Sequence, residues 1–85
     1  MLINDVKNLL MQGRTVYVTL WVPKDGGGYV IEFGTGGASS SLGTTSKPDI
    51  AKKFKSADSA IKAISPLKHY VNCCFKIGFL GVSFG

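Results

Sequence analysis

A β-hairpin in the first half of the chain constrains the fold more than any other feature of the sequence. In "TVYVTLWV", residues 15 to 22, valine and leucine alternate with threonine and aromatic residues, which is the period-2 pattern of a strand. Pro23 ends this strand, and "KDGGG" provides residues that tolerate positive φ. "YVIEF", residues 29 to 33, then returns as the second strand. The chain is therefore expected to build a sheet around this hairpin.

A helix is predicted before the hairpin. Residues 2 to 12, "LINDVKNLLMQ", place their apolar side chains three and four positions apart, as in an amphipathic helix. Gly13 follows as a left-handed C-terminal cap. After the hairpin, "GTGGASSSLGTTSKP" has a single large apolar side chain, Leu42. This segment, about residues 34 to 48, is predicted to be a flexible Gly/Ser/Thr loop.

The segment from 48 to 65 fits two interpretations. Its apolar residues follow a helical spacing, but residues 50 to 54 also alternate as in a strand. Ser56 with Asp58 behind it is typical of an N-cap followed by an acid in the first turn. We therefore predict a third strand over about 50–55 and a helix over 57–64, which Pro66 stops. A single helix from 48 to 65 is the alternative.

The closing stretch "NCCFKIGFLGVSFG", residues 72 to 85, is predicted to contain the last strand. One side of this strand is fully apolar and comprises Val71, Cys73, Phe75, Ile77 and Phe79. Gly78 and Gly81 are expected to mark a bulge or a place where another backbone or ring lies close. The two adjacent cysteines then face opposite ways, and both are expected to be reduced, because neighbouring Cα atoms are too close for an ordinary disulfide.

These elements predict an α+β fold in a single small domain over residues 1–85. The predicted order is αβββαβ, with a mainly antiparallel four-stranded sheet and two helices on one face. A chain of 85 residues has room for one core. Its 45% hydrophobic and 18% charged residues are typical of a globular protein.

The sequence offers few components for catalysis. His69 is the only histidine, and no motif places a serine or a carboxylate beside it. A cysteine nucleophile paired with His69 is the sharpest enzymatic hypothesis, but the strand pattern already accounts for a buried Cys73. The Gly-rich segment does not match a phosphate-binding loop. We predict no catalytic residue, no metal and no cofactor, and hence a protein that is not an enzyme.

Positive charge is concentrated in the second half of the chain. Residues 1 to 46 balance to zero, whereas the remainder carries seven lysines against two aspartates and provides the whole net charge of +5. Such asymmetry indicates either a polyanionic or acidic partner, or a lysine-rich solvated face that keeps the protein soluble. Without a visible signal peptide or a run of about 20 apolar residues, we expect a cytoplasmic protein that does not bind membranes.

Two groups of residues are candidates for nucleic-acid binding. Tyr17 and Trp21 share a strand face and could stack on bases, unless the first helix covers that face and makes them core residues. The candidate phosphate contacts are Lys47, Lys52, Lys53, Lys55, Lys62 and Lys68.

The segments "GGGYVIEF", "KKFKSADSAIKAI" and "NCCFKIGF" together resemble small proteins encoded by plasmids and phages. The resemblance implies a strand hairpin, a turn into an Ala-rich helix and a final strand. It also implies a non-enzymatic accessory factor of a mobile element.

The leading functional hypothesis is therefore a non-enzymatic binding protein whose lysine-rich half contacts nucleic acid. The alternative is a protein-interaction module, such as an inhibitor or adaptor of a host complex, or a homodimer. This module would use a sheet edge or the apolar C-terminal strand. For this alternative, the positive charge of the second half of the chain predicts an acidic protein surface as the partner.

Overall fold

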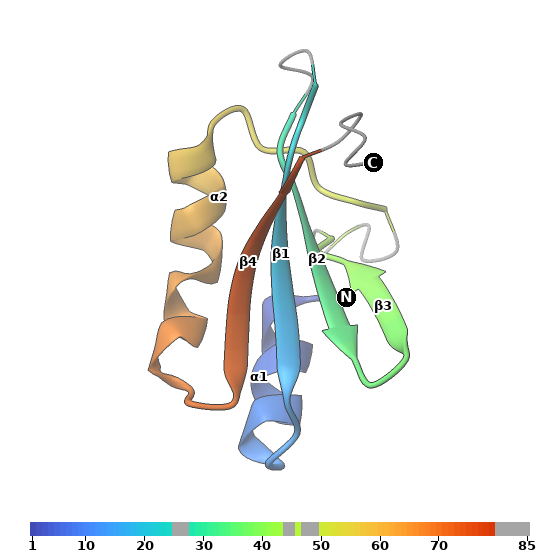
Figure 1. Cartoon of the computed structure of the whole chain (residues 1–85), viewed down its shortest axis with the longest axis vertical. Coiled ribbons are helices and arrows are strands. Elements are labelled where there is room, and N and C mark those ends of the chain that lie inside the picture. The colour runs from blue at the N-terminus through green and yellow to red at the C-terminus, as the bar shows by residue number, and fades with distance from the viewer. Residues whose placement is uncertain (25–27, 44–45, 47–49, 80–85) are drawn as a thin grey trace.

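The described part of the chain folds into one four-stranded sheet with two α-helices (Figure 1). The computed structural model describes residues 1–24, 28–43, 46 and 50–79. In chain order the elements are α1 (Ile3–Met11), β1 (Val16–Val22), β2 (Val30–Thr35), β3 (Ala38–Ser41), α2 (Ala57–Ile64), the 3₁₀ helix η1 (Ser65–His69) and β4 (Cys73–Phe79). The predicted α+β class and the αβββαβ order are confirmed.

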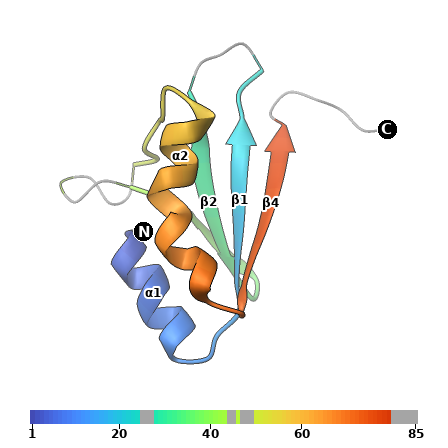
Figure 2. The same ribbon diagram turned by 90° about the vertical axis from the view of Figure 1, so that its left-hand side faces the viewer.

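The sheet has the strand order β3-β2-β1-β4. Strands β1, β2 and β3 pair antiparallel with their sequence neighbours, whereas β4 joins the other side of β1 in parallel. Two of the three pairings are antiparallel, as predicted. Both helices lie on the same face of the sheet, with α2 beside β4 (Figure 2). No helix of the described residues covers the opposite sheet face.

The core lies between the helices and one face of the sheet. Alternate positions of β1 and β2 point into it, and the largest side chains there with almost no exposed surface include Phe33 and Ile31 of β2. The other members of this buried cluster are Val6, Leu10, Val16, Val18, Leu20, Leu42, Phe54, Ala60, Ile64, Leu67 and Cys73. Both helices and all strands except β3 contribute, so one cluster holds the two layers together.

The third strand is not where the sequence predicted it. β3 occupies residues 38–41, inside the predicted flexible loop. It pairs with β2, and the turn between the two strands consists of Gly36 and Gly37. Both glycines have positive φ, at 56° and 107°, which is the backbone that a two-residue hairpin turn requires. The serine-rich strand has low intrinsic β-propensity, so pairing with β2 determines its conformation.

The predicted strand over 50–55 is an extended segment with one isolated bridge. The backbones of Tyr29 and Phe54 exchange two hydrogen bonds of 2.8 Å, and the Lys52 N–H donates to the Leu42 carbonyl at 2.8 Å. The flexible loop predicted for 34–48 is also wrong over its first part, because residues 34–41 belong to β2, the turn and β3. Residues 44–45 and 47–48 of that loop lie outside the described part of the chain.

Helix α2 begins and ends where the sequence predicted. Ser56 is its N-cap, and the Ser56 hydroxyl accepts a hydrogen bond of 3.2 Å from the Ser59 N–H. The alternative of one helix from 48 to 65 is therefore wrong. Beyond Ile64 the chain continues as the 3₁₀ helix η1, whose first turn accommodates Pro66 because that position needs no N–H donor.

Asn72 fixes the start of β4 against the turn between α1 and β1. Its side-chain amide donates to the carbonyls of Leu10 and Arg14, and its own carbonyl accepts from the Val16 N–H at 3.0 Å. The turn itself depends on Gly13, whose φ of 85° confirms the predicted left-handed cap. Residues 10–16 and the start of β4, which are far apart in the sequence, are thus held together where β4 begins.

Candidate functional site

Tyr17 and Trp21, the predicted stacking residues, share the sheet face that carries no helix. Together with Thr19 they form one alternating side of β1, and Val18 and Leu20 between them point into the core. The alternative in which α1 covers the aromatic face is therefore wrong. Tyr17 is exposed, whereas Trp21 is partly buried because its ring lies over Gly78, where a Cβ atom would come within 2.5 Å of it. The expected close approach at Gly78 is confirmed, and Gly81 lies outside the described residues.

The predicted phosphate contacts lie on several elements. Those in the described part of the chain are all exposed: Lys52, Lys53, Lys55, Lys62 and Lys68. Lys47 lies outside the described residues. Lys52 and Lys68 line hollows on the helix side of the sheet. The structure therefore does not bring these two lysines to the face that carries Tyr17 and Trp21.

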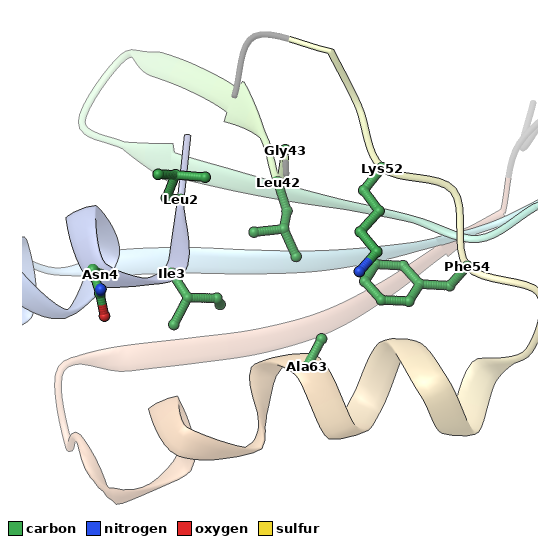
Figure 3. Close-up of a pocket in the computed structure, with 8 residues that line it drawn as sticks. All are labelled: Leu2, Ile3, Asn4, Leu42, Gly43, Lys52, Phe54 and Ala63. Atoms are coloured by element: carbon green, nitrogen blue, oxygen red, sulfur yellow. The ribbon is translucent and has the colours of Figure 1, made fainter. Parts of the chain in front are cut away.

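One hollow, of about 370 Å³, lies between α1, the end of β3 and α2 (Figure 3). It is lined by Leu2, Ile3, Asn4, Leu42, Gly43, Lys52, Phe54 and Ala63. The Lys52 ammonium lies 4.9 Å from the centroid of the Phe54 ring, a cation–π contact. Asn4 and Lys52 are the polar side chains among the described lining residues, which include no carboxylate, histidine or cysteine. This hollow therefore lacks the acid and base groups that proton transfer requires.

A larger groove, of about 630 Å³, lies between α2 and β4 at the edge of the sheet. It is lined by Val18, Leu20, Ile61, Ile64, Ser65, Lys68, Phe75, Lys76 and Ile77. Most of this lining is aliphatic or aromatic, contributed by β1, α2 and β4. Lys68 and Lys76 are the charged residues among the described lining, although the register beside Thr19 places the Lys76 side chain on the other face of the sheet. The groove is thus an apolar channel with positive charge at its border.

The helix-facing side of β4 is poorly covered. Phe75, Ile77 and Phe79 are 46%, 62% and 50% exposed, although the register places Phe75 and Ile77 beside core residues of β1. Ala60 and Ile64 of α2 are buried. Ile61 follows Ala60 by one residue, so its side chain points in a different direction around the helix axis and stays half exposed beside the groove. Ile61, Phe75 and Ile77 therefore face water along one channel, and Phe79 is half exposed farther along the same strand, which is an unusual exposure for a small monomer.

The backbone of β4 also has a free edge. In the described part of the chain no strand lies beyond β4, and the Val16 N–H donates inward to Asn72. In a parallel pair, the N–H and C=O groups of one residue point to the same side of the strand, and this side alternates from one residue to the next. The even-numbered residues of β4 therefore face β1, and the N–H and C=O groups of Phe75, Ile77 and Phe79 point outward.

Comparisons with protein-family models, with curated proteins and with solved structures found no significant match to this chain. The groove and the free edge of β4 are therefore the observations on which a function can be proposed.

The described residues contain no group of three or more His, Cys, Asp or Glu side chains that could hold a metal ion. None of the helices in this part of the chain is long and apolar enough to cross a membrane. His69 is exposed at the end of η1.

The two cysteines face opposite ways, as the alternation predicted. Both are free thiols; Cys73 is buried, and Cys74 is exposed on the sheet face without helices. Burial, and secondly the neighbouring Cys74, raises the pKa of the Cys73 thiol. A raised pKa keeps Cys73 protonated and weakly nucleophilic, which does not favour the hypothesis of an activated cysteine.

Thiol labelling is expected to separate the two cysteines. With iodoacetamide near pH 8, Cys74 should react quickly, and Cys73 should react slowly because it is buried and has the smaller thiolate fraction. Intact-mass spectrometry should show one fast adduct that Cys74→Ser removes and Cys73→Ser retains. The protonated Cys73 stabilises the fold below the ordinary thiol pKa of about 8.5, and this contribution is lost as pH rises through the raised pKa. Two adducts forming at equal rates would contradict this assignment.

Sequence reasoning found the apolar side of β4 but missed three groove residues. Ile61 was recognised only as one of the apolar residues that follow a helical spacing, and Lys68 was considered only as a phosphate contact. Lys76 was not singled out. A signal for Ile61 exists in the sequence, because Ala60, Ile64 and Leu67 form a separate stripe at spacings of four and three.

Proposed function

We propose that this protein is a non-enzymatic protein-interaction module that binds an extended segment of another protein along the free edge of β4. The observation that carries the proposal is the exposure of Phe75, Ile77 and Phe79 on a strand whose outward backbone groups belong to the same residues. An added strand would form hydrogen bonds with these groups and cover their side chains in one step.

The composition of β4 supports this mode of binding. Edge strands are commonly protected by lysine, by proline, by a bulge or by a charge that points inward, and β4 has one such lysine, Lys76. On its helix side β4 carries only Cys73, Phe75, Ile77 and Phe79, and it pairs with β1 in an uninterrupted register. Lys76 points to the other face, next to Thr19 of β1. The helix-side edge is therefore open to a partner strand.

Nucleic-acid binding through the lysines stays a prediction from the sequence, as does a role as a mobile-element accessory factor in the cytoplasm. The exposure of Lys52, Lys53 and Lys55 is compatible with phosphate contacts. The aromatic residues Tyr17 and Trp21 lie on the other side of the sheet from Lys52, so they do not add a stacking surface beside that lysine. A steep loss of oligonucleotide affinity with rising salt is the measurement that checks this hypothesis.

Amide hydrogen exchange tests the open edge in the free protein. We expect fast exchange at Phe75, Ile77 and Phe79 and slow exchange at Cys74, Lys76 and Gly78, whose N–H groups face β1. Extended peptides selected from a random library against the folded chain should slow the first three amides on binding. Ile77→Lys should weaken these peptides at least about tenfold, which corresponds to 1.4 kcal/mol.

Ile50→Lys is the matched control, because Ile50 is 61% exposed, like Ile77, but does not line the groove. It should leave peptide binding unchanged. The proposal fails if selected peptides bind Ile77→Lys as well as they bind the wild type, or if they protect amides outside β4. It also fails if the three outward amides are already protected in a dilute sample.

A further inference from the structure

We infer that the segment bound at β4 alternates apolar residues with acidic residues. This inference rests on the proposed function, because it specifies the chemistry of the strand that would add to the edge. Successive side chains of a strand point to opposite faces of the sheet. An added strand therefore presents every second residue to the α2 groove and the remaining residues to the face without helices, and these two surroundings differ.

The helix-side positions require apolar residues. They would meet Ile61 of α2 and the half-exposed side chains of Phe75 and Ile77, above the buried Val18 and Leu20. The groove volume of about 630 Å³ lies within the range of pockets that hold small ligands, about 300–1,000 Å³. Charged side chains placed there would lose hydration without a partner, except next to Lys68 at the end of the groove where β4 begins.

The opposite positions favour acidic residues. Lys76 is exposed at the centre of β4 on this face, so it would be the direct neighbour of a side chain on an added strand. Opposite charges in such cross-strand pairs are favourable and like charges are unfavourable. Lys62 and Lys68 add positive charge on the helix side, where Asp58, in the first turn of α2, is the acid in the described part of that helix. Glu32 of β2 lies in the same cross-strand row as Lys76, two strands in from the edge. Lys76 in β4 itself and Lys68 in the groove lining are therefore the charges next to an added strand.

A second copy of this chain fits the edge less well. Two β4 strands that pair antiparallel with their apolar sides on the same face, and with all seven residues of each in register, place Lys76 opposite Lys76. Each chain also carries a net charge of +5. Like charges directly opposite destabilise a strand pair, whereas an acidic strand meets the same lysine favourably. Charge complementarity thus favours a different protein as the partner.

Three synthetic peptides of equal length test the inference: isoleucine alternating with glutamate, with glutamine or with lysine. We expect the glutamate peptide to bind the wild type most tightly and the lysine peptide several-fold more weakly, because the residue directly opposite Lys76 changes from opposite to like charge. Lys76→Glu should reverse this order. Lys55→Glu makes the same change of charge at an exposed residue that does not line the groove, and it should preserve the order.

The outcomes separate the inference from the function it rests on. If the three peptides bind equally and Ile77→Lys weakens all of them, the proposal of strand addition at β4 is kept. The inference that the bound segment carries acidic residues is then overturned. If no peptide slows the exchange of the Phe75, Ile77 and Phe79 amides, strand addition itself is overturned. If Lys55→Glu changes the peptide preference as much as Lys76→Glu does, this preference depends only on the net charge of the chain. The inferred alternation of apolar and acidic residues is then wrong.

Discussion

Replacing Leu67 with alanine is expected to lower the free energy of unfolding by about 2–5 kcal/mol, the cost of truncating a buried leucine. Leu67 has no exposed surface and belongs to the central hydrophobic cluster. It is the residue through which η1, the link between α2 and β4, packs into the core. Because small domains are stable by only about 5–15 kcal/mol, such a loss is a large part of the total. Urea unfolding followed by far-UV circular dichroism measures it.

Two variants control for this effect. Leu67→Met nearly conserves side-chain volume and should cost less than about 1.5 kcal/mol. Ile61→Ala removes a similar number of carbons from a side chain that is half exposed, so it should cost clearly less than Leu67→Ala. Equal losses from Leu67→Ala and Ile61→Ala would contradict the packing of η1 described above.

The elements that the sequence predicted correctly are those with strong local signals. Strand β1 follows from its period-2 alternation, and α2 follows from Ser56, whose hydroxyl caps the helix in the structure. Strand β3 lacked such a signal within its own residues, because serine has no preference for a strand. The useful signal lay beside it in Gly36 and Gly37, a two-residue turn that the flexible-loop prediction absorbed. The conformation of β3 is otherwise determined by its register with β2, which is a non-local property.

The candidate site was only partly predictable for a similar reason. Alternation identified Phe75, Ile77 and Phe79 as one apolar side, but a local pattern does not reveal whether a strand lies at the centre or the edge of a sheet. The strand order places β4 at an edge, and that order depends on contacts with β1, more than fifty residues away in the sequence. The exposure of Ile61 likewise depends on how α2 is rotated on the sheet. Tertiary packing therefore decided that the predicted apolar strand, already a candidate interaction surface in the sequence, lies at the edge of the sheet.

Replacing Gly78 with alanine is expected to displace the Trp21 ring and to destabilise the fold by about 1–3 kcal/mol, as overpacking does. A Cβ atom at this position would lie 2.5 and 2.6 Å from two ring carbons of Trp21. The ring lies on the sheet face without helices and can move only by leaving β4 and exposing its own apolar surface. Trp21 is the single tryptophan of the chain, so its fluorescence should shift to the red in the folded variant.

Gly34→Ala is the matched control for Gly78→Ala. Gly34 lies in β2, and an added Cβ would come no closer than 3.9 Å to any neighbour, an ordinary contact. This variant should be near neutral in stability and in fluorescence. In a Trp21→Ala background, the cost of Gly78→Ala should largely disappear, because the atoms that the new methyl group meets are gone. An unchanged cost in that background would show that Gly78 is required by the backbone of β4 and not by the ring, and would remove Trp21 as a support for the edge strand.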